Sequence, residues 1–159
     1  MPFAGQGVTR SRQSRRMSRR AGSRPAPRLL GLLSLAAASC AGAPSIAIAG
    51  QEAQLSPVLL RTCSIFMRIE NAGSGDDSLL GATVGIPGAV AELHGVVDGR
   101  MVKQDRVRIP ARGAVKLEPG GLHVMVFGLP SDAGAGYQFT LRLSFERTGE
   151  KVASVRIAG

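Results

Sequence analysis

The stretch "YQFTLRLSFE", Tyr137 to Glu146, decides the fold class, because its side chains alternate strictly between apolar and polar. Phe139, Leu141, Leu143 and Phe145 form the apolar set, and polar or charged residues stand between them. Side chains of a β-strand point to opposite faces in turn. A period of two therefore predicts a strand that packs one face against a core and leaves the other in water.

Similar runs of β-type residues follow one another through most of the chain. They are bounded by turn residues at close spacing, as in the Asp98-Gly99 pair that tight hairpins favour. The runs are "CSIFMRIE" (63–70), "SLLGATV", "AVAELHGVV", "RVRIP", "AVKLEP", "GLHVMVFGL", "YQFTLRLSFE" and "KVASVRIAG".

About eight or nine short strands without a helical pattern predict an all-β antiparallel sandwich or barrel. Residues from about Gln51 to Leu60 show no strong periodicity, so we expect an extended lead-in there. Aromatic residues make up only 4% of the chain and tryptophan is absent, so the core must be aliphatic.

The net charge of +9 suggests a nucleic-acid partner, but its distribution argues against one. Residues 1–49 hold eight arginines and no acidic residue, whereas residues 50–159 hold 12 basic and 11 acidic residues. The expected mature domain is therefore nearly neutral, and we expect no nucleic-acid binding.

The first 49 residues have the pattern of an export leader. Arginines precede the apolar run Leu29–Ala43, and Ala47 and Ala49 stand where a signal peptidase would cut before Gly50. The sequence thus predicts a leader at 1–49, a mature domain at 50–159, a periplasmic location and no membrane span after processing.

Two other fates of the leader stay open at this stage. The apolar run could remain as a membrane anchor, although it is shorter than the roughly 20 residues of a typical span. Ser39-Cys40 could instead end a lipobox, which would attach a lipid to Cys40. Met17 is an alternative start that would give a more ordinary leader.

If the leader is removed before Gly50, Cys63 is the only cysteine left, and a disulfide within the mature domain is impossible. Cys63 lies in an apolar alternating run, which favours a small buried residue over a metal ligand or a reactive thiol.

The histidines and methionines carry the chemistry of this sequence. Both histidines of the chain and two of its methionines form the pattern His94-x6-Met101-x21-His123-x-Met125. His123 and Met125 stand two apart on one predicted strand, so their side chains share a face. Paired strands could bring all four residues to one patch.

This donor set favours copper(I), because thioether sulfur is soft and uncharged and selects cuprous ions over zinc, magnesium or calcium. Zinc is the rival for two histidines, but zinc sites usually add cysteine or carboxylate ligands. The alternative without a metal is that Met101 and Met125 fill a core and the histidines lie at the surface.

The region from about Ile65 to Val155 resembles the PCuAC family of periplasmic copper chaperones. The resemblance rests on "MRIENAGSGDDSLLGATV", "AELH", "DGRM", "IPARGAVKLEPGGLHVMVFGL" and "FTLRLSFERTGE". The family motif is a histidine, a methionine and, after 21 residues, His-x-Met, and Met101, His123 and Met125 match it in full. The first gap is usually about ten residues and is six here, so His94 matches by its place after "AEL" but across a shortened loop.

The resemblance implies a cupredoxin-like Greek-key fold and a monomeric Cu(I) chaperone. It further implies delivery of copper to a partner such as the copper centre of a cytochrome c oxidase subunit. We expect no enzymatic activity, because no nucleophile–base motif accompanies the two histidines. The competing interpretations are an exported β-sandwich interaction or assembly module without metal, and a redox copper protein, which would need a cysteine ligand.

Overall fold

The computed structural model describes residues 42–159, and in this range the chain forms ten β-strands and no helix. The strands are β1 (Ile46–Leu55), β2 (Thr62–Asn71), β3 (Asp77–Val84), β4 (Val90–Val97), β5 (Arg100–Lys103), β6 (Val107–Ile109), β7 (Gly113–Leu117), β8 (His123–Phe127), β9 (Gln138–Phe145) and β10 (Gly149–Ile157). The predicted all-β class is confirmed.

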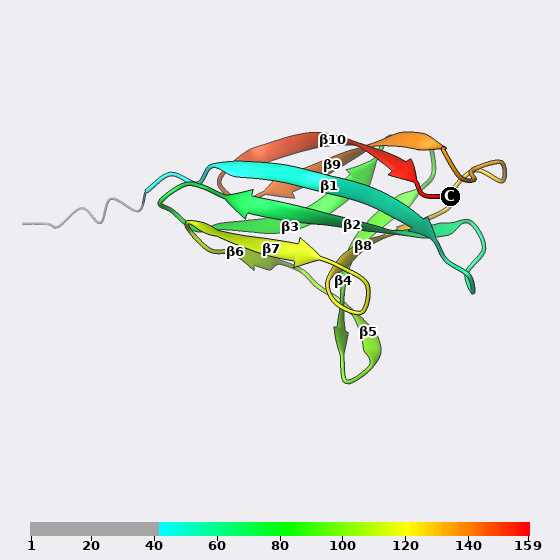
Figure 1. Ribbon diagram of the computed structural model, residues 1–159, viewed down its shortest axis with the longest axis horizontal. Coiled ribbons are helices and arrows are strands. Elements are labelled where there is room, and N and C mark those ends of the chain that lie inside the picture. Colours follow the sequence, from blue (N-terminus) through cyan, green and yellow to red (C-terminus); the bar gives the residue numbers. More distant parts are fainter. Residues whose placement is uncertain (1–41) are drawn as a thin grey trace, which may run out of the picture. The chain divides into compact units, whose positions relative to one another are not determined.

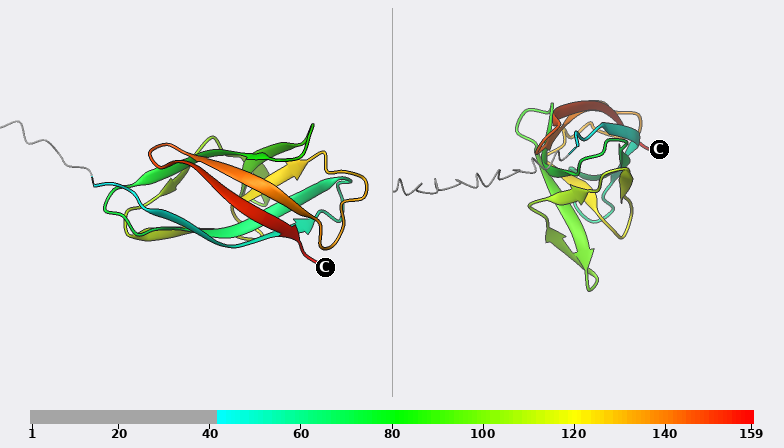
Figure 2. Two further views of the ribbon diagram at one scale, coloured as in Figure 1. Left: turned by 90° about the horizontal axis from the view of Figure 1, so that it is seen from above. Right: turned by 90° about the vertical axis from the view of Figure 1, so that its left-hand side faces the viewer.

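The strands form one curled sheet in the order β5-β4-β8-β2-β1-β10-β9-β3-β6, with β7 paired to β2 (Figure 1). Neighbours are antiparallel, except that β1 and β10 run parallel. Seen along other directions, the sheet wraps around its own interior (Figure 2). This arrangement is consistent with the predicted cupredoxin-like sandwich or barrel.

The interior of the curl is an aliphatic core, as the low aromatic content predicts. The four alternating apolar residues of β9 are all buried, with Leu141 and Leu143 fully inaccessible to solvent. They pack in one cluster with Ile65 and Ile69 of β2 and Val124 of β8. The alternation of apolar and polar residues in β9 therefore predicts correctly which side chains face the core.

Strand β1 corrects the expectation of an unpaired lead-in after Gly50. Residues 51–55, expected as a lead-in, belong to a strand that pairs with both β2 and β10. This strand begins at Ile46, four residues before the predicted domain start, and Ile46 and Ala53 are buried. The arginine-rich leader and the apolar run before Gly42 lie outside the described residues.

Asp77, at the start of β3, is a structural carboxylate and not part of a solvated loop. Its side chain is buried and accepts hydrogen bonds from the backbone N–H groups of Ser78 (2.8 Å), Arg147 (2.9 Å) and Thr148 (3.0 Å). Burial raises the pKa of this carboxyl, but the hydrogen bonds from Thr148, Arg147 and Ser78 outweigh it and hold the pKa below its usual value.

Strands β4 and β5 form a hairpin that extends away from the rest of the sheet (Figures 1 and 2). Its turn, Asp98-Gly99, has positive φ at both residues, 51° and 73°, as a two-residue type I′ turn requires. The predicted tight turn is confirmed. No helix in the described part of the chain is long and apolar enough to cross a membrane.

Candidate metal centre

Strand β8 places His123 and Met125 on the face opposite to the core. Val124 and Val126 belong to the hydrophobic core cluster, whereas Met125 does not, although it is only 3% exposed. His123 is also buried, at 6% exposure. The alternation of faces predicted for this stretch is therefore observed, and the imidazole and thioether share one side of the strand.

Strand β4 brings His94 next to this pair. In the antiparallel register His94 is opposite His123, and Glu92 is opposite Met125. Residues directly opposite each other on paired strands have side chains on the same face. The ring centroids of the two histidines are 5.9 Å apart, so the shortened gap before Met101 does not keep His94 away from His123.

Met101 lies on the same face but at its open edge. Strand β5 pairs with β4 so that Met101 is opposite Val96 and Lys103 is opposite His94. Met101 is thus a diagonal neighbour of His94, a relation that puts Cα atoms about 7–8 Å apart. Its side chain is 55% exposed. Three of the predicted residues are therefore enclosed, and the fourth stands on the projecting hairpin.

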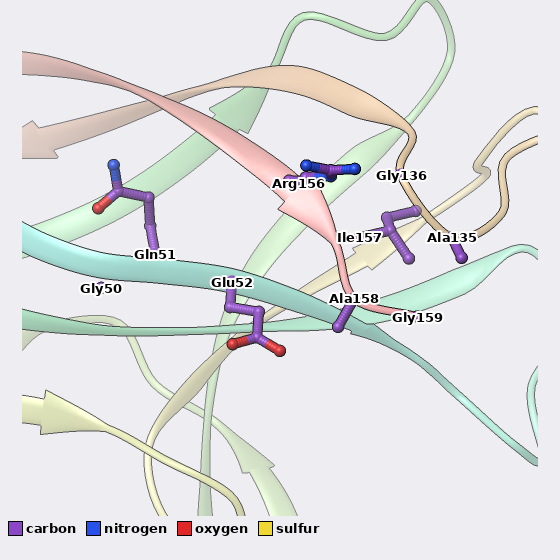
Figure 3. Close-up of a pocket in the computed structure, with 9 residues that line it drawn as sticks. All are labelled: Gly50, Gln51, Glu52, Ala135, Gly136, Arg156, Ile157, Ala158 and Gly159. Atoms are coloured by element: carbon purple, nitrogen blue, oxygen red, sulfur yellow. The ribbon is translucent and has the colours of Figure 1, made fainter.

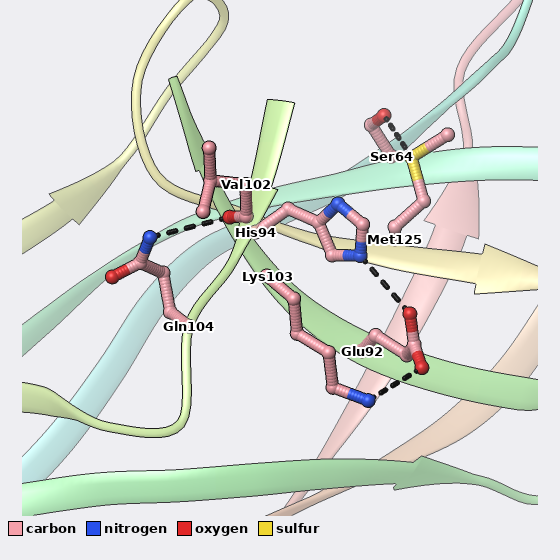
Figure 4. A network of polar contacts seen from close by, with 7 residues as sticks. All are labelled: Ser64, Glu92, His94, Val102, Lys103, Gln104 and Met125. Carbon is pink, nitrogen blue, oxygen red and sulfur yellow. Dashed lines mark hydrogen bonds and ion pairs between the residues drawn. The ribbon is translucent and has the colours of Figure 1, made fainter. Parts of the chain in front are cut away.

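The protein holds His123 and Met125 in defined environments. Nδ1 of His123 donates a hydrogen bond to the backbone carbonyl of Gly121 at 3.0 Å, because a carbonyl can only accept. In the neutral ring this leaves the lone pair on Nε2. The Ser64 hydroxyl contacts Sδ of Met125 at 3.5 Å (Figure 4). The ring of Phe66 lies 6.3 Å from that of His123 and adds an apolar wall.

His94 makes its hydrogen bond through Nε2, whereas His123 uses Nδ1. Nε2 lies 3.1 Å from a carboxylate oxygen of Glu92, and Nζ of Lys103 donates to the other oxygen at 2.7 Å (Figure 4). Hydrogen bonds from Lys103 and His94 lower the pKa of the Glu92 carboxyl. In residues 42–159, Nδ1 of His94 is the one buried side-chain nitrogen or oxygen without a hydrogen-bond partner.

Cys63 does not belong to this constellation. It is fully buried on the core side of β2, and burial raises the pKa of its thiol to about 11. The predicted role as a small buried residue is confirmed. Across residues 42–159 no three His, Cys, Asp or Glu side chains form a group that could hold a metal ion.

A pocket of about 530 Å³ lies elsewhere, where β1 meets the end of β10 (Figure 3). Its lining includes Gln51, Glu52, Gly136 and Arg156 but no histidine or methionine. It therefore offers none of the soft donors that the β4–β5–β8 face presents.

Sequence reasoning missed Glu92, Lys103 and Ser64. The signal for Glu92 was present in "AELH", because residues two apart on a strand share a face. Lys103 and Ser64 depend on the register between strands, which the sequence does not reveal.

The model of one protein family, described as "Putative lipoprotein LpqE-like", matches residues 46–157. The chain belongs to this LpqE-like family. The matched region begins at the first residue of β1 and ends at the last residue of β10. A relative from Leifsonia xyli subsp. xyli, described as "Putative lipoprotein Lxx21020", is 35% identical in an alignment of 98 residues that covers 57% of this chain. The aligned part spans 58% of that relative's length.

Solved structures identify the fold of this LpqE-like chain as that of PCuAC domains. The copper-bound PCuAC domain from PmoF2 has a TM-score of 0.60 at 19% identity, over 72% of this chain and 92% of that domain. The apo PCuAC domain from PmoF1 has a TM-score of 0.61 at 23% identity, over 72% and 94%. The CuI-DR1885 structure from Deinococcus radiodurans has a TM-score of 0.53 at 22% identity, over 69% and 75%. The resemblance to PCuAC domains is confirmed at the level of the fold.

Proposed function

We propose that this protein is a metallochaperone that binds one Cu(I) ion through His94, Met101, His123 and Met125 and passes it to an acceptor protein. The observation that carries the proposal is the unpartnered, buried Nδ1 of His94 beside the ring of His123. A buried polar atom without a partner costs free energy. A site built to receive a metal ion accounts for that cost.

The chemistry of the donors selects the ion. Two imidazoles and two thioethers carry no negative charge, and soft sulfur favours Cu(I) over harder divalent ions. The absence of a thiolate suits an oxidising compartment, where cysteines tend to form disulfides. The copper-bound PCuAC domain from PmoF2, which has the same fold, supports the choice of metal.

The division of the site into enclosed and exposed parts fits a carrier. His123 and Met125 are almost fully buried, whereas Met101 is more than half exposed on the projecting hairpin. An acceptor can therefore reach the ion from the hairpin side. We propose a monomeric carrier without catalytic activity, and a copper centre such as that of a cytochrome c oxidase subunit as the acceptor.

The experiment that tests this function is a competition titration of Cu(I) against a chromophoric Cu(I) chelator, repeated with Zn(II). We expect one Cu(I) per chain and much weaker zinc binding. Equal competition by zinc would contradict the Cu(I)-selective site. No uptake of either metal would leave the alternative of a metal-free interaction module, in which Met125 is only a packing residue.

We further propose that the chain is exported to the periplasmic side of the membrane and that Cys40 becomes its lipid-modified N-terminus. The family and its Leifsonia relative are both described as putative lipoproteins. A cut after Ala49 would remove the first four of the ten residues of β1, including the pairing of Ile46 with Asn71.

The segment just before β1 adds support for processing at Cys40. The backbone N–H of Ser45 donates to Oδ1 of Asn71 at 2.9 Å, and the N–H of Ala72 donates to the carbonyl of Ser45 at 2.9 Å. Processing at Cys40 keeps these bonds, whereas the cut before Gly50 loses them. Edman sequencing or mass spectrometry of the exported protein distinguishes the two.

A further inference from the structure

A short ionic chain stands behind His94. Glu92 lies between the histidine and Lys103, and each of its carboxylate oxygens has one partner: Oε2 faces Nε2 of His94 at 3.1 Å, and Oε1 accepts from Lys103 at 2.7 Å (Figure 4). All three side chains project from the same face of the β4–β5 hairpin, because Lys103 is opposite His94 and Glu92 is two residues from it.

The interactions of Glu92 with His94 and Lys103 determine which nitrogen of His94 carries the proton and which has the lone pair. A carboxylate only accepts hydrogen bonds, so Nε2 of His94 must carry the proton. In the neutral ring the lone pair then resides on Nδ1, the buried atom that has no partner. His123 has the opposite arrangement, because its Nδ1 donates to Gly121.

We propose that Glu92, held in place by Lys103, is a positioning residue that fixes His94 as its Nε2–H tautomer and presents Nδ1 to the metal ion. The inference rests on the proposed copper site and adds residues that the His/Met motif does not contain. It also assigns the ligand atoms: Nδ1 from His94 and Nε2 from His123. Partners that orient a ligating histidine in this way also raise its basicity.

Glu92 is not itself a ligand in this arrangement. Both of its oxygens are engaged by neighbouring donors. A hard carboxylate is also a poor partner for Cu(I). Lys103 lies at the solvent end of this row of three side chains, and its side chain is 60% exposed. Lys103 therefore holds the Glu92 carboxylate in place and does not shield the metal.

The first test reads the tautomers directly in the metal-free protein. Long-range ¹H–¹⁵N correlation spectra should show His94 as Nε2–H and His123 as Nδ1–H. Glu92→Ala should turn His94 into a mixture of tautomers and leave His123 unchanged. A wild-type His94 that carries its proton on Nδ1 would overturn the inference, and the dispersion of the same spectra shows that each variant is folded.

The second test measures Cu(I) affinity by competition with the chelator. Glu92→Ala should weaken binding by about 10- to 100-fold, the usual effect of losing such a partner. Glu92→Gln keeps an acceptor for Nε2–H and should recover most of the affinity. Glu146→Ala is the matched control, because Glu146, just after β9, forms an exposed ion pair of the same 2.7 Å length with Arg106, just before β6, and should change nothing.

The outcomes separate this inference from the proposed function. If the wild-type protein binds Cu(I) and Glu92→Ala binds it equally well, the positioning role is wrong and the chaperone function stands. If the wild-type protein does not bind Cu(I), both fail.

Discussion

Replacing Met125 by leucine separates a copper ligand from a packing residue. The side chain is 3% exposed, so a methionine that merely fills space is a real alternative. Leucine keeps the volume and the apolar character but removes the sulfur. The metal-free protein should lose less than about 1.5 kcal/mol of stability, as is usual for such a swap. The Ser64 contact adds little to this loss, because a thioether is a weak acceptor.

The effect on copper should be much larger than the effect on folding. The proposed site loses one of its four ligands, a neutral sulfur, and the remaining donors His94, Met101 and His123 are held on the paired strands β4, β5 and β8. We expect Cu(I) affinity to fall on the order of 100-fold, which corresponds to about 2.8 kcal/mol. Chelator competition gives the affinity. Thermal melting with and without Cu(I) gives an independent measure, since a ligand that binds only the folded state raises its stability.

Met67 offers a matched control. It is also 3% exposed, but it lies on the core face of β2 and belongs to the hydrophobic cluster. Met67→Leu should cost a similar small amount of stability and leave Cu(I) affinity unchanged. If Met125→Leu and Met67→Leu bind Cu(I) equally well, Met125 is a packing residue and the reasoning is refuted.

Three other predictions test different parts of the molecule. Met101→Leu should weaken Cu(I) binding without changing the melting temperature of the metal-free protein, because Met101 is 55% exposed. His94→Ala should weaken Cu(I) binding because an enclosed donor is lost. Cu(I) titrations and thermal melts of the two variants, measured side by side, check both. The free energy of unfolding should fall as pH drops below about 4. The folded state lowers the pKa of Asp77 and so favours the ionised carboxylate, and the stabilisation that Asp77 contributes disappears as pH falls through this lowered pKa. In Asp77→Asn the slope should become shallower but not vanish, because the pKa values of the Asp76 and Glu92 carboxyls are also lowered. About 2 kcal/mol should be lost in denaturant titrations at pH 7. Cys40→Ala should release the exported protein from the membrane fraction; a variant that stays membrane-bound would contradict lipidation at this residue.

The sequence predicts most strands because they follow a period of two, and it misses β1 for identifiable reasons. The register of β1 with β2 shifts between Ala49 and Glu52, and Gly50 there has φ of 62°. A bulge of this kind breaks the alternation of faces. The first four residues of the strand, "IAIA", also satisfy the small-residue pattern of a cleavage site, so the sequence alone places them in the leader.

The sequence predicts that His123 and Met125 share one face, which the structure bears out, whereas metal binding by the four candidate residues stays a prediction. The His-x-Met spacing places His123 and Met125 together on any strand, as observed. The exposure of Met101 depends on the length of the hairpin beyond the sheet, and the role of Glu92 depends on a tautomer. Both follow from the pairing of β4 with β5 and β8, which one sequence alone does not determine.

The parallel pairing of β1 with β10 sets the order in which this protein can complete its fold. Glu52 lies opposite Arg156, so β1 acquires its second neighbour only from β10, which comes much later in the chain. Bringing β1 and β10 together closes a long loop, and the entropy of the chain falls before the new hydrogen bonds stabilise it. Such non-local contacts make folding slow. While the chain emerges N-terminus first, one edge of β1 therefore stays unpaired until β10 has emerged. During that interval the open edge is available to other strands, which makes incomplete chains prone to aggregation.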